Sequence, residues 1–309
     1  MKPNLFFKIS LAFYPLLIFV LLLGCGMFIP TLPVSPTHTP SITLTSSPSP
    51  TATLPPIPTP SINLQSSIAM DRTCRSVVDG LQTIKKGLKY PDHYSTGDYS
   101  RQASDFDPNL YFKVFTHLQM SPDYVLDYLM FSDTLGGKPL LYARKTDASP
   151  FKSDDEFLKS LNENGSDQRT LSTLKHSQDY LQKIVLDGSP ESYYQLITLS
   201  MFGDQFYLAW HGNYNDAQMV CDLSDLKSIN ADLQFFNLSL PQDVTDRAQD
   251  INFHPGIIVK DKTVTARFIT FSKWGGFVEN LVVFNSQAPY QTINHKQTNL
   301  VSYECGILF

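Results

Sequence analysis

Residues 264–284 read VTARFITFSKWGGFVENLVVF, and this stretch decides the fold. Two runs rich in β-branched and aromatic residues flank the sequence Trp274-Gly275-Gly276. Such runs around a short turn that contains glycine are typical of a β-hairpin. The sequence therefore predicts two long antiparallel strands, over residues 264–272 and 277–284.

A second hairpin is predicted earlier in the chain, over residues 124–131 and 139–143, around Gly136-Gly137. Its turn region, FSDTLGG at residues 131–137, resembles FSKWGG at residues 271–276. Two interpretations are open. Each stretch is a good hairpin turn in its own right, or the chain contains a duplicated sheet unit and hence two related halves.

Spacing and turn residues place the remaining elements. We expect helices over residues 71–88, 109–118, 153–161, 222–233 and 242–249, the third opened by a Ser153–Glu156 capping box. We expect strands over residues 181–186, 193–201, 205–211, 217–221 and 301–309, the first three as a meander. Tight turns join neighbouring strands, whereas parallel pairs need long crossovers. The predicted class is α+β, a mainly antiparallel sheet of hairpins with helices packed on it.

The distribution of charge marks a domain boundary. No Asp, Glu, Lys or Arg occurs between Ile9 and Met70, and all 29 acidic residues follow. Between Pro30 and Pro60, ten residues are proline and most others are Ser or Thr. Such a segment cannot bury enough apolar surface to offset its chain entropy. We expect a disordered tether over residues 25–67 and a globular domain over residues 68–309.

The N-terminus has the parts of an export signal. Lys2 and Lys8 precede an apolar run, which ends in the sequence Leu22-Leu23-Gly24-Cys25. This ending resembles the lipobox of bacterial lipoproteins. The resemblance implies a signal peptide over residues 1–24, cleavage before Cys25 and a diacylglycerol on the Cys25 thiol.

An uncleaved single-span anchor is the alternative, because apolar character continues to Ile29 and about 20 such residues span a bilayer. In both interpretations the positive charge lies only before the apolar run. The predicted location is therefore the bacterial cell membrane, with the domain on the extracytoplasmic side.

Three further cysteines, Cys74, Cys221 and Cys305, lie in the domain. In an exported protein two of them are expected to form a disulfide, and three pairings are open. Cys221 with Cys305 closes the shortest loop, which gives that pairing a weak entropic preference. The cysteines are too dispersed for a zinc site, and we expect neither a metal nor a cofactor.

Two polar patches supply the candidate ligand-binding residues. The first follows the strand that ends at Trp210, and it consists of His211, Asn213, Asn215 and Asp216. The second is Trp274, at the tip of the C-terminal hairpin. A plain loop is the alternative for the first patch, and a tryptophan folded onto the core is the alternative for the second.

The sequence Asp105-Phe106-Asp107-Pro108-Asn109 alternates carboxylates as calcium loops do. Leu110 and Thr116 stand where an EF-hand requires Gly and Glu. We therefore expect an Asx turn that caps the next helix.

Two classes of function remain, because the chain contains no nucleophile elbow, zinc-binding helix or phosphate-binding loop. The first is a membrane-anchored lipoprotein that displays a ligand- or partner-binding domain. The second is a tethered hydrolase of envelope polymer or polysaccharide, with His211 and Asp216 as acid and base. The expected partners are the bilayer and an envelope ligand or protein. Nucleic acid is not expected, because the domain is acidic.

Overall fold

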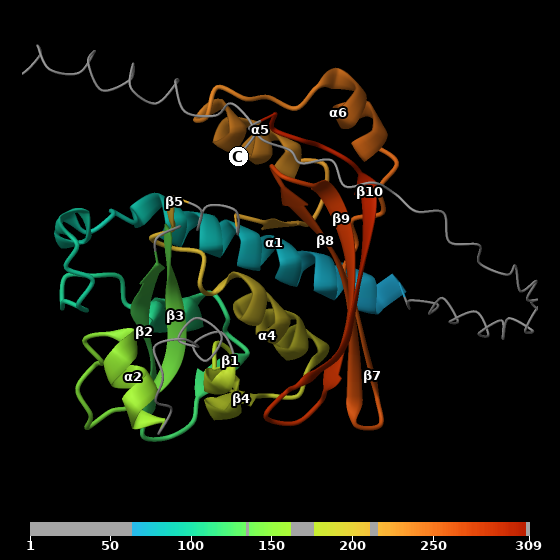
Figure 1. The fold of residues 1–309 in the computed structure, drawn as a ribbon. Helices are drawn as coiled ribbons and strands as arrows, with labels where there is room; N and C mark the ends of the chain where they lie inside the picture. Colours follow the sequence, from blue (N-terminus) through green and yellow to red (C-terminus); the bar gives the residue numbers. More distant parts are fainter. Residues whose placement is uncertain (1–63, 134–135, 162–175, 211–215, 307–309) are drawn as a thin grey trace, which may run out of the picture. The chain divides into compact units, whose positions relative to one another are not determined.

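The computed structural model describes residues 64–133, 136–161, 176–210 and 216–306, which all belong to one compact unit, Thr59–Phe309. This unit is an α+β fold of antiparallel sheets with helices packed on them, as predicted (Figure 1). The predicted signal peptide and almost all of the tether, Cys25 included, lie outside the described residues.

The largest sheet is built on the hairpin that was predicted from residues 264–284. The two hairpin strands pair along their whole length, and a third long strand extends the sheet at one edge. Two short strands pair with successive parts of the first hairpin strand. The members are β6 (Gln218–Val220), β7 (Gly256–Lys260), β8 (Thr263–Ser272), β9 (Gly276–Asn285) and β10 (Thr292–Val301).

The second predicted hairpin forms a separate sheet of β2 (Tyr124–Asp133), β3 (Gly136–Lys145) and β5 (Ala209–Trp210). A third sheet pairs β1 (Leu118–Met120) with β4 (Ile184–Leu186). The two similar turn stretches therefore both close hairpins, in different sheets. Their origin in two related halves stays a prediction.

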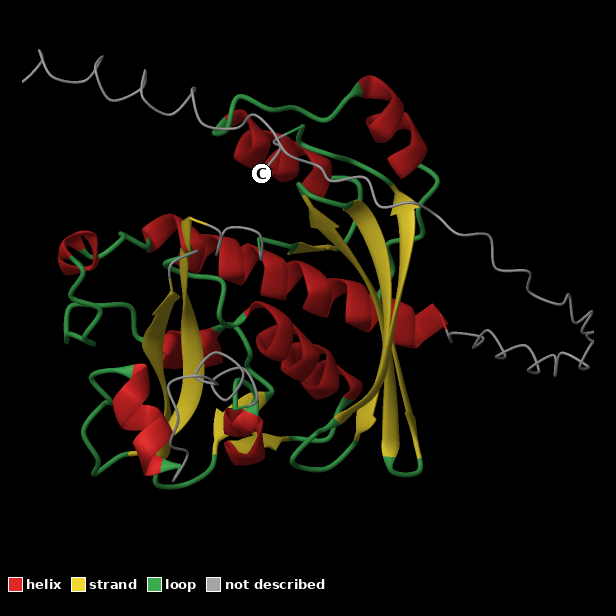
Figure 2. Ribbon diagram, viewed as in Figure 1, coloured by secondary structure: helices red, strands yellow, loops and turns green. Residues whose placement is uncertain are grey.

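Two helices lie between the two larger sheets, α1 (Leu64–Gly87) and α4 (Pro190–Phe202) (Figure 2). The outer face of the β2–β3 hairpin packs on α2 (Asp154–Ser160). The far face of the large sheet packs on α5 (Asp225–Gln234) and α6 (Gln242–Ala248). Three short 3-10 helices complete the described elements: η1 (Asp92–Thr96), η2 (Pro108–Lys113) and η4 (Asp179–Lys183).

Strand β8 separates two of the three apolar cores, because successive side chains of a strand point to opposite faces. Ala266 and Phe268 belong to the core around α1 and α4, whereas Ile269 and Phe271 belong to the core under α5 and α6. All four side chains are buried. The long predicted strand therefore stabilises helices on both of its sides.

Several predicted elements are confirmed. The helices predicted over residues 71–88, 153–161, 222–233 and 242–249 correspond to α1, α2, α5 and α6. At the start of α2, the backbone N–H of Glu156 donates to Ser153 Oγ at 3.3 Å, as the capping box requires. The strand predicted over residues 217–221 is β6.

The predicted meander is wrong, because residues 193–201 belong to helix α4 and the strands on either side of it, β4 and β5, pair with β1 and β3 instead. Ser189 caps this helix by accepting the N–H of Ser192 at 3.1 Å, and Pro190 occupies its first position. Every residue from Ser192 to Leu199 is buried. A helix buried on all sides shows no 3.6-residue period, so its apolar run resembled a strand. The third predicted strand, over residues 205–211, is reduced to β5.

The prediction of a strand over residues 301–309 is also wrong. The last strand is β10, a polar edge strand that is exposed at nine of its ten positions, so the sequence shows no buried face there. Val301, Tyr303 and Cys305 do alternate as buried residues, but residues 302–306 form no regular strand. Likewise, the helix predicted over residues 109–118 is reduced to the short 3-10 helix η2, which ends at Lys113, and Leu118 already belongs to β1.

Candidate functional site

A groove of about 740 Å³ between helices α1 and α5 is the candidate site. Its floor is formed by β6, by Phe271 and by the chain that follows α4. We call it the α1–α5 groove. Its principal lining residues are Val78, Leu81, Ile84 and Leu88 of the α1 side, Ile229 and Leu233 of α5, and Phe206, Tyr207, Met219 and Phe271 below them.

The groove is largely apolar because side chains of both wall helices that pack on the apolar cores also line it. On α1, Val77 is completely buried in the core, while Leu81 and Ile84 are only partly buried and face the groove. Residues three or four apart lie on one side of a helix. The spacing that predicted the helix therefore gives it one apolar side, which is buried in the core at Val77 and lines the groove at Leu81 and Ile84.

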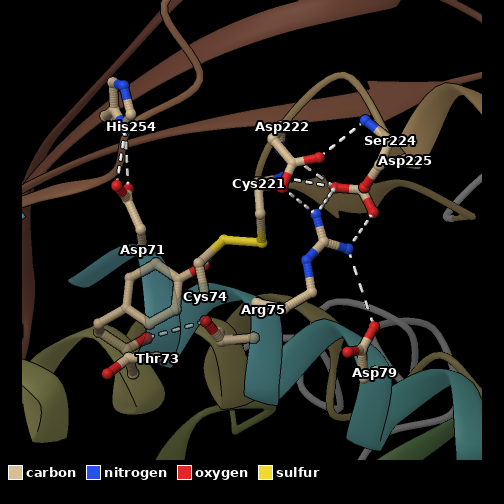
Figure 3. The surroundings of a disulfide bond; sticks show 12 residues. Asp71, Thr73, Cys74, Arg75, Asp79, Cys221, Asp222, Ser224, Asp225 and His254 are labelled. Carbon is tan, nitrogen blue, oxygen red and sulfur yellow. Dashed lines mark hydrogen bonds and ion pairs between the residues drawn. A yellow bond between two sulfur atoms is a disulfide. The ribbon is translucent and has the colours of Figure 1, made fainter. Parts of the chain in front are cut away.

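The middle of helix α1 is joined to the start of α5 and to the chain just before it (Figure 3). Cys74 of α1 forms a disulfide with Cys221, which lies just before α5. Beside it, the guanidinium of Arg75 donates to Asp225 Oδ1 and to Asp222 Oδ2, each at 2.6 Å. A covalent bond and a bidentate charge network thus fix one end of the groove.

The electrostatics of this network follow from its geometry. Burial alone would lower the pKa of Arg75, but hydrogen bonds to Asp225 and Asp222 raise it above its ordinary value. Burial alone would raise the pKa of Asp222, but hydrogen bonds from Ser224 and Arg75 lower it below the usual range. Arg75 and Asp222 therefore stay charged at neutral pH.

Two further contacts join the walls along their length. Gln82 Nε2 donates to Ser228 Oγ at 3.2 Å, and Lys85 Nζ lies 3.5 Å from Asp232 Oδ2. The groove is therefore held in shape without a ligand, as small-molecule sites usually are.

A buried ion pair also lines the groove, where Lys273 Nζ lies 2.7 Å from Asp216 Oδ2. Lys273 is only 5% exposed, and its ammonium also lies over the ring of Phe236, 4.2 Å from the centroid. The second carboxylate oxygen, Asp216 Oδ1, is buried and accepts no hydrogen bond from any described residue. It is available as an acceptor for a donor group of a ligand.

The lining residues also include exposed aromatic side chains. Phe235 is 84% exposed, Phe236 is 45% exposed and Tyr90 is 41% exposed. Large exposed aromatic side chains that cluster around a concavity often mark a binding surface. The groove is thus suited to an apolar or aromatic molecule with few polar groups.

The two patches singled out in the sequence converge here in part. Asp216 of the first patch is paired with Lys273, the neighbour of Trp274 in the second, and Trp274 packs against the core under α5 and α6. The Lys273 ammonium lies 5.5 Å from the centroid of the Trp274 ring. His211, Asn213 and Asn215 lie outside the described residues.

Sequence reasoning missed the α1 and α5 walls and the aromatic residues between them. One signal was present, since Phe235 and Phe236 directly follow a predicted amphipathic helix without belonging to its apolar face. No comparable signal marks the α1 wall, because core and groove residues share the same apolar side of the helix.

The preferred cysteine pairing, Cys221 with Cys305, is wrong. Cys221 pairs with Cys74, with 5.8 Å between the Cα atoms, and Cys305 is a free, buried thiol. Loop-closure entropy changes only slowly with loop length, so the packing of α1 against β6 decides the pairing.

The Asx-turn prediction is confirmed, because Asp107 Oδ1 accepts the N–H of Asn109 at 3.0 Å at the start of η2. No group of three or more His, Cys, Asp or Glu side chains suited to a metal occurs among the described residues. In the same part of the chain, no helix is both long and apolar enough to cross a membrane.

Comparison of the chain with models of protein families, with curated proteins and with solved structures finds no match.

Proposed function

We propose that this protein is a lipid-anchored extracytoplasmic protein whose domain binds an apolar small molecule in the α1–α5 groove. The observation that carries the proposal is the groove itself. It has a volume within the range of small-molecule sites, a predominantly apolar lining and a buried ion pair, Lys273–Asp216.

The anchor and location are supported by the N-terminal sequence and by the chemistry of the domain. The lipobox-like ending at Cys25 and the Pro-rich segment after it fit a domain held at a distance from a bilayer. The Cys74–Cys221 disulfide fits an oxidising compartment.

The alternative, a tethered hydrolase, needs His211 beside Asp216 as an acid and base pair. Asp216 is engaged by Lys273, and His211 lies outside the described residues. Binding is therefore the function that the described geometry favours, and the hydrolase stays a prediction.

The neutral dye N-phenylnaphthylamine, which fluoresces in apolar surroundings, tests the proposal with the fragment 59–309. This fragment contains the disulfide, all three apolar cores and every described strand pair. A cooperative thermal melt establishes first that it is folded. We expect saturable enhancement of the dye fluorescence.

Two variants of α1 locate the dye. Leu81 lines the groove, whereas Thr83 is exposed on the other side of the helix. Leu81→Gln should weaken dye binding about tenfold, because it places a polar amide in an apolar site, while Thr83→Gln should leave it unchanged. Absence of dye binding by the folded fragment, or equal binding by both variants, would refute the groove as the site.

A further inference from the structure

A second cavity, of about 390 Å³, adjoins the α1–α5 groove. The two share three lining residues, Phe202, Gln205 and Ala217, so little more than these side chains separates them. We call the second one the Lys138–Asp204 cavity after the ion pair in its wall.

The charges of this cavity offset each other. Lys138 Nζ lies 3.2 Å from Asp204 Oδ2, and both side chains are partly exposed. Burial raises the pKa of Asp204 above its ordinary value even though Lys138 acts to lower it. A charged group entering the cavity would therefore meet both an opposite and a like charge at close range, which gives an ionic head group no clear advantage.

The rest of the polar lining consists of neutral hydrogen-bonding side chains. The amides of Gln178 and Gln205 form no side-chain hydrogen bond with any described residue. Ser200 Oγ donates to the carbonyl of Ile197 and keeps its lone pairs for a further donor, and Ser272 lines the cavity from the end of β8. Amides and hydroxyls that both donate and accept match the hydroxyl groups of a sugar or polyol.

We propose that the groove and the cavity hold one amphipathic molecule, with its alkyl or isoprenoid chain in the α1–α5 groove and an uncharged polyhydroxyl head group in the Lys138–Asp204 cavity. This inference rests on the proposed function of the groove and adds the class of ligand. Gln205 lines both spaces and would contact the junction of chain and head group.

The test uses the full-length protein in membranes of the cells that produce it. Two photoactivatable dodecyl β-D-glucosides serve as probes, one with a diazirine at the end of the alkyl chain and one with a diazirine on the sugar. After irradiation, tandem mass spectrometry of peptic peptides locates each label to a residue. We expect the chain probe on groove-lining residues of α1 and α5, and the sugar probe on residues at or next to Gln178, Ser200 or Gln205.

Variants and head-group analogues sharpen the test. The double variant Gln178→Ala, Gln205→Ala should reduce sugar-probe labelling about tenfold, as the loss of two neutral hydrogen bonds predicts, while chain-probe labelling persists. Gln182→Ala is the matched control, because Gln182 is exposed and lines neither space. Unlabelled dodecyl glucoside should compete better than dodecyl phosphate or dodecyltrimethylammonium.

The outcomes separate this inference from the proposed function. If the chain probe labels the groove but the sugar probe labels nothing in the cavity, or if an ionic analogue competes best, the head-group inference is overturned and the groove proposal stands. If neither probe labels α1 or α5, both are overturned. A normal melting temperature of the double variant shows that lost labelling does not reflect unfolding.

Discussion

Lys273 and Asp216 form an ion pair of 2.7 Å that joins the end of strand β8 to the chain just before β6. A similar pair, Lys138 with Asp204 at 3.2 Å, joins strand β3 to the chain after α4. Each lysine lies beside one of the two similar hairpin turns, and each aspartate lies between α4 and β6. The first ion pair lines the α1–α5 groove, and the second lines the Lys138–Asp204 cavity.

Removing Asp216 should leave the charge of Lys273 buried without its partner. We expect Asp216→Asn to lower the free energy of unfolding by about 3 kcal/mol, and the further change Lys273→Met to recover most of that loss. Urea unfolding of both variants measures these effects.

An exposed ion pair provides the control. Asp243 and Arg247 of α6 lie 3.4 Å apart, with more than half of each side chain exposed. Asp243→Asn should therefore lower the free energy of unfolding by less than about 0.5 kcal/mol. If Asp216→Asn lowers the free energy of unfolding no more than Asp243→Asn does, the buried charge of Lys273 does not need Asp216 as its partner.

The disulfide between Cys74 and Cys221 should contribute substantially to stability, because it links residues that are 147 positions apart. We expect the double variant Cys74→Ala, Cys221→Ala to lose about 2–5 kcal/mol of unfolding free energy. Dithiothreitol should lower the melting temperature of the wild type but not that of the double variant.

A variant of Cys305 tests the pairing, because both alternative disulfides would contain this residue. Because Cys305 is a free thiol, Cys305→Ala should keep the full response to dithiothreitol. Peptide mapping without reductant should recover Cys74 linked to Cys221. A linked peptide that contains Cys305 would show that the pairing is wrong.

The turn between β8 and β9 provides a matched pair of glycines. Gly276 has φ near +80°, and a Cβ at this position would lie 2.2 Å from the carbonyl oxygen of Val301. At Gly275 the nearest atom to an added Cβ is Ser272 Oγ at 3.5 Å, which is an ordinary contact. Backbone cannot move aside as a side chain can, so only Gly276 requires glycine.

We expect Gly276→Ala to lower the free energy of unfolding by about 3 kcal/mol or more, from a strained backbone and a direct clash. Gly275→Ala should change it by less than about 1 kcal/mol. Denaturant unfolding of the two variants measures both effects, and equal losses would show that residues 301–303 do not pack against this turn.

The hairpins were predictable because their signal is local. Residues 264–284 contain the β-branched and aromatic runs, the turn and the glycine that the turn requires, all within a short stretch. Helix α1 was predictable for the same reason. Helix α4 was not, because burial on every side removes the period by which a helix is recognised.

The candidate site was predictable only in part. Asp216 and Trp274 were identified as polar and aromatic residues near turns, but nothing in the sequence placed the two patches together. The groove depends on contacts such as Arg75 with Asp225, which are 150 positions apart. Such contacts arise from the packing of α1 against α5, which local patterns do not specify.

The proposed anchor makes a separate prediction. If a diacylglycerol is attached to Cys25, Cys25→Ala should abolish incorporation of a labelled fatty acid and leave the precursor uncleaved, so that it migrates more slowly on a gel. Detergent-phase partition and gel migration identical to those of the wild type would favour the uncleaved anchor. Cys305→Ala is the control for the loss of a cysteine that carries no lipid.

Alkaline pH should unfold the domain cooperatively, because many of its tyrosines are buried. Burial raises the pKa of ten tyrosines above the ordinary value of about 10: Tyr90, Tyr94, Tyr111, Tyr128, Tyr142, Tyr180, Tyr194, Tyr207, Tyr290 and Tyr303. In the unfolded chain these phenols lose their protons first. Their contribution to stability is therefore complete below about pH 10 and is lost as the pH rises through the folded-state pKa values.

A titration that follows tyrosinate absorbance and circular dichroism together measures this effect. We expect one steep transition above about pH 10 in which ionisation and loss of structure coincide. Tyr180→Phe should move the transition to higher pH, because it removes a buried phenol whose hydrogen bond to the carbonyl of Leu199 is long at 3.3 Å. Gradual ionisation near pH 10 without loss of structure would mean that these phenols reach water in the folded domain.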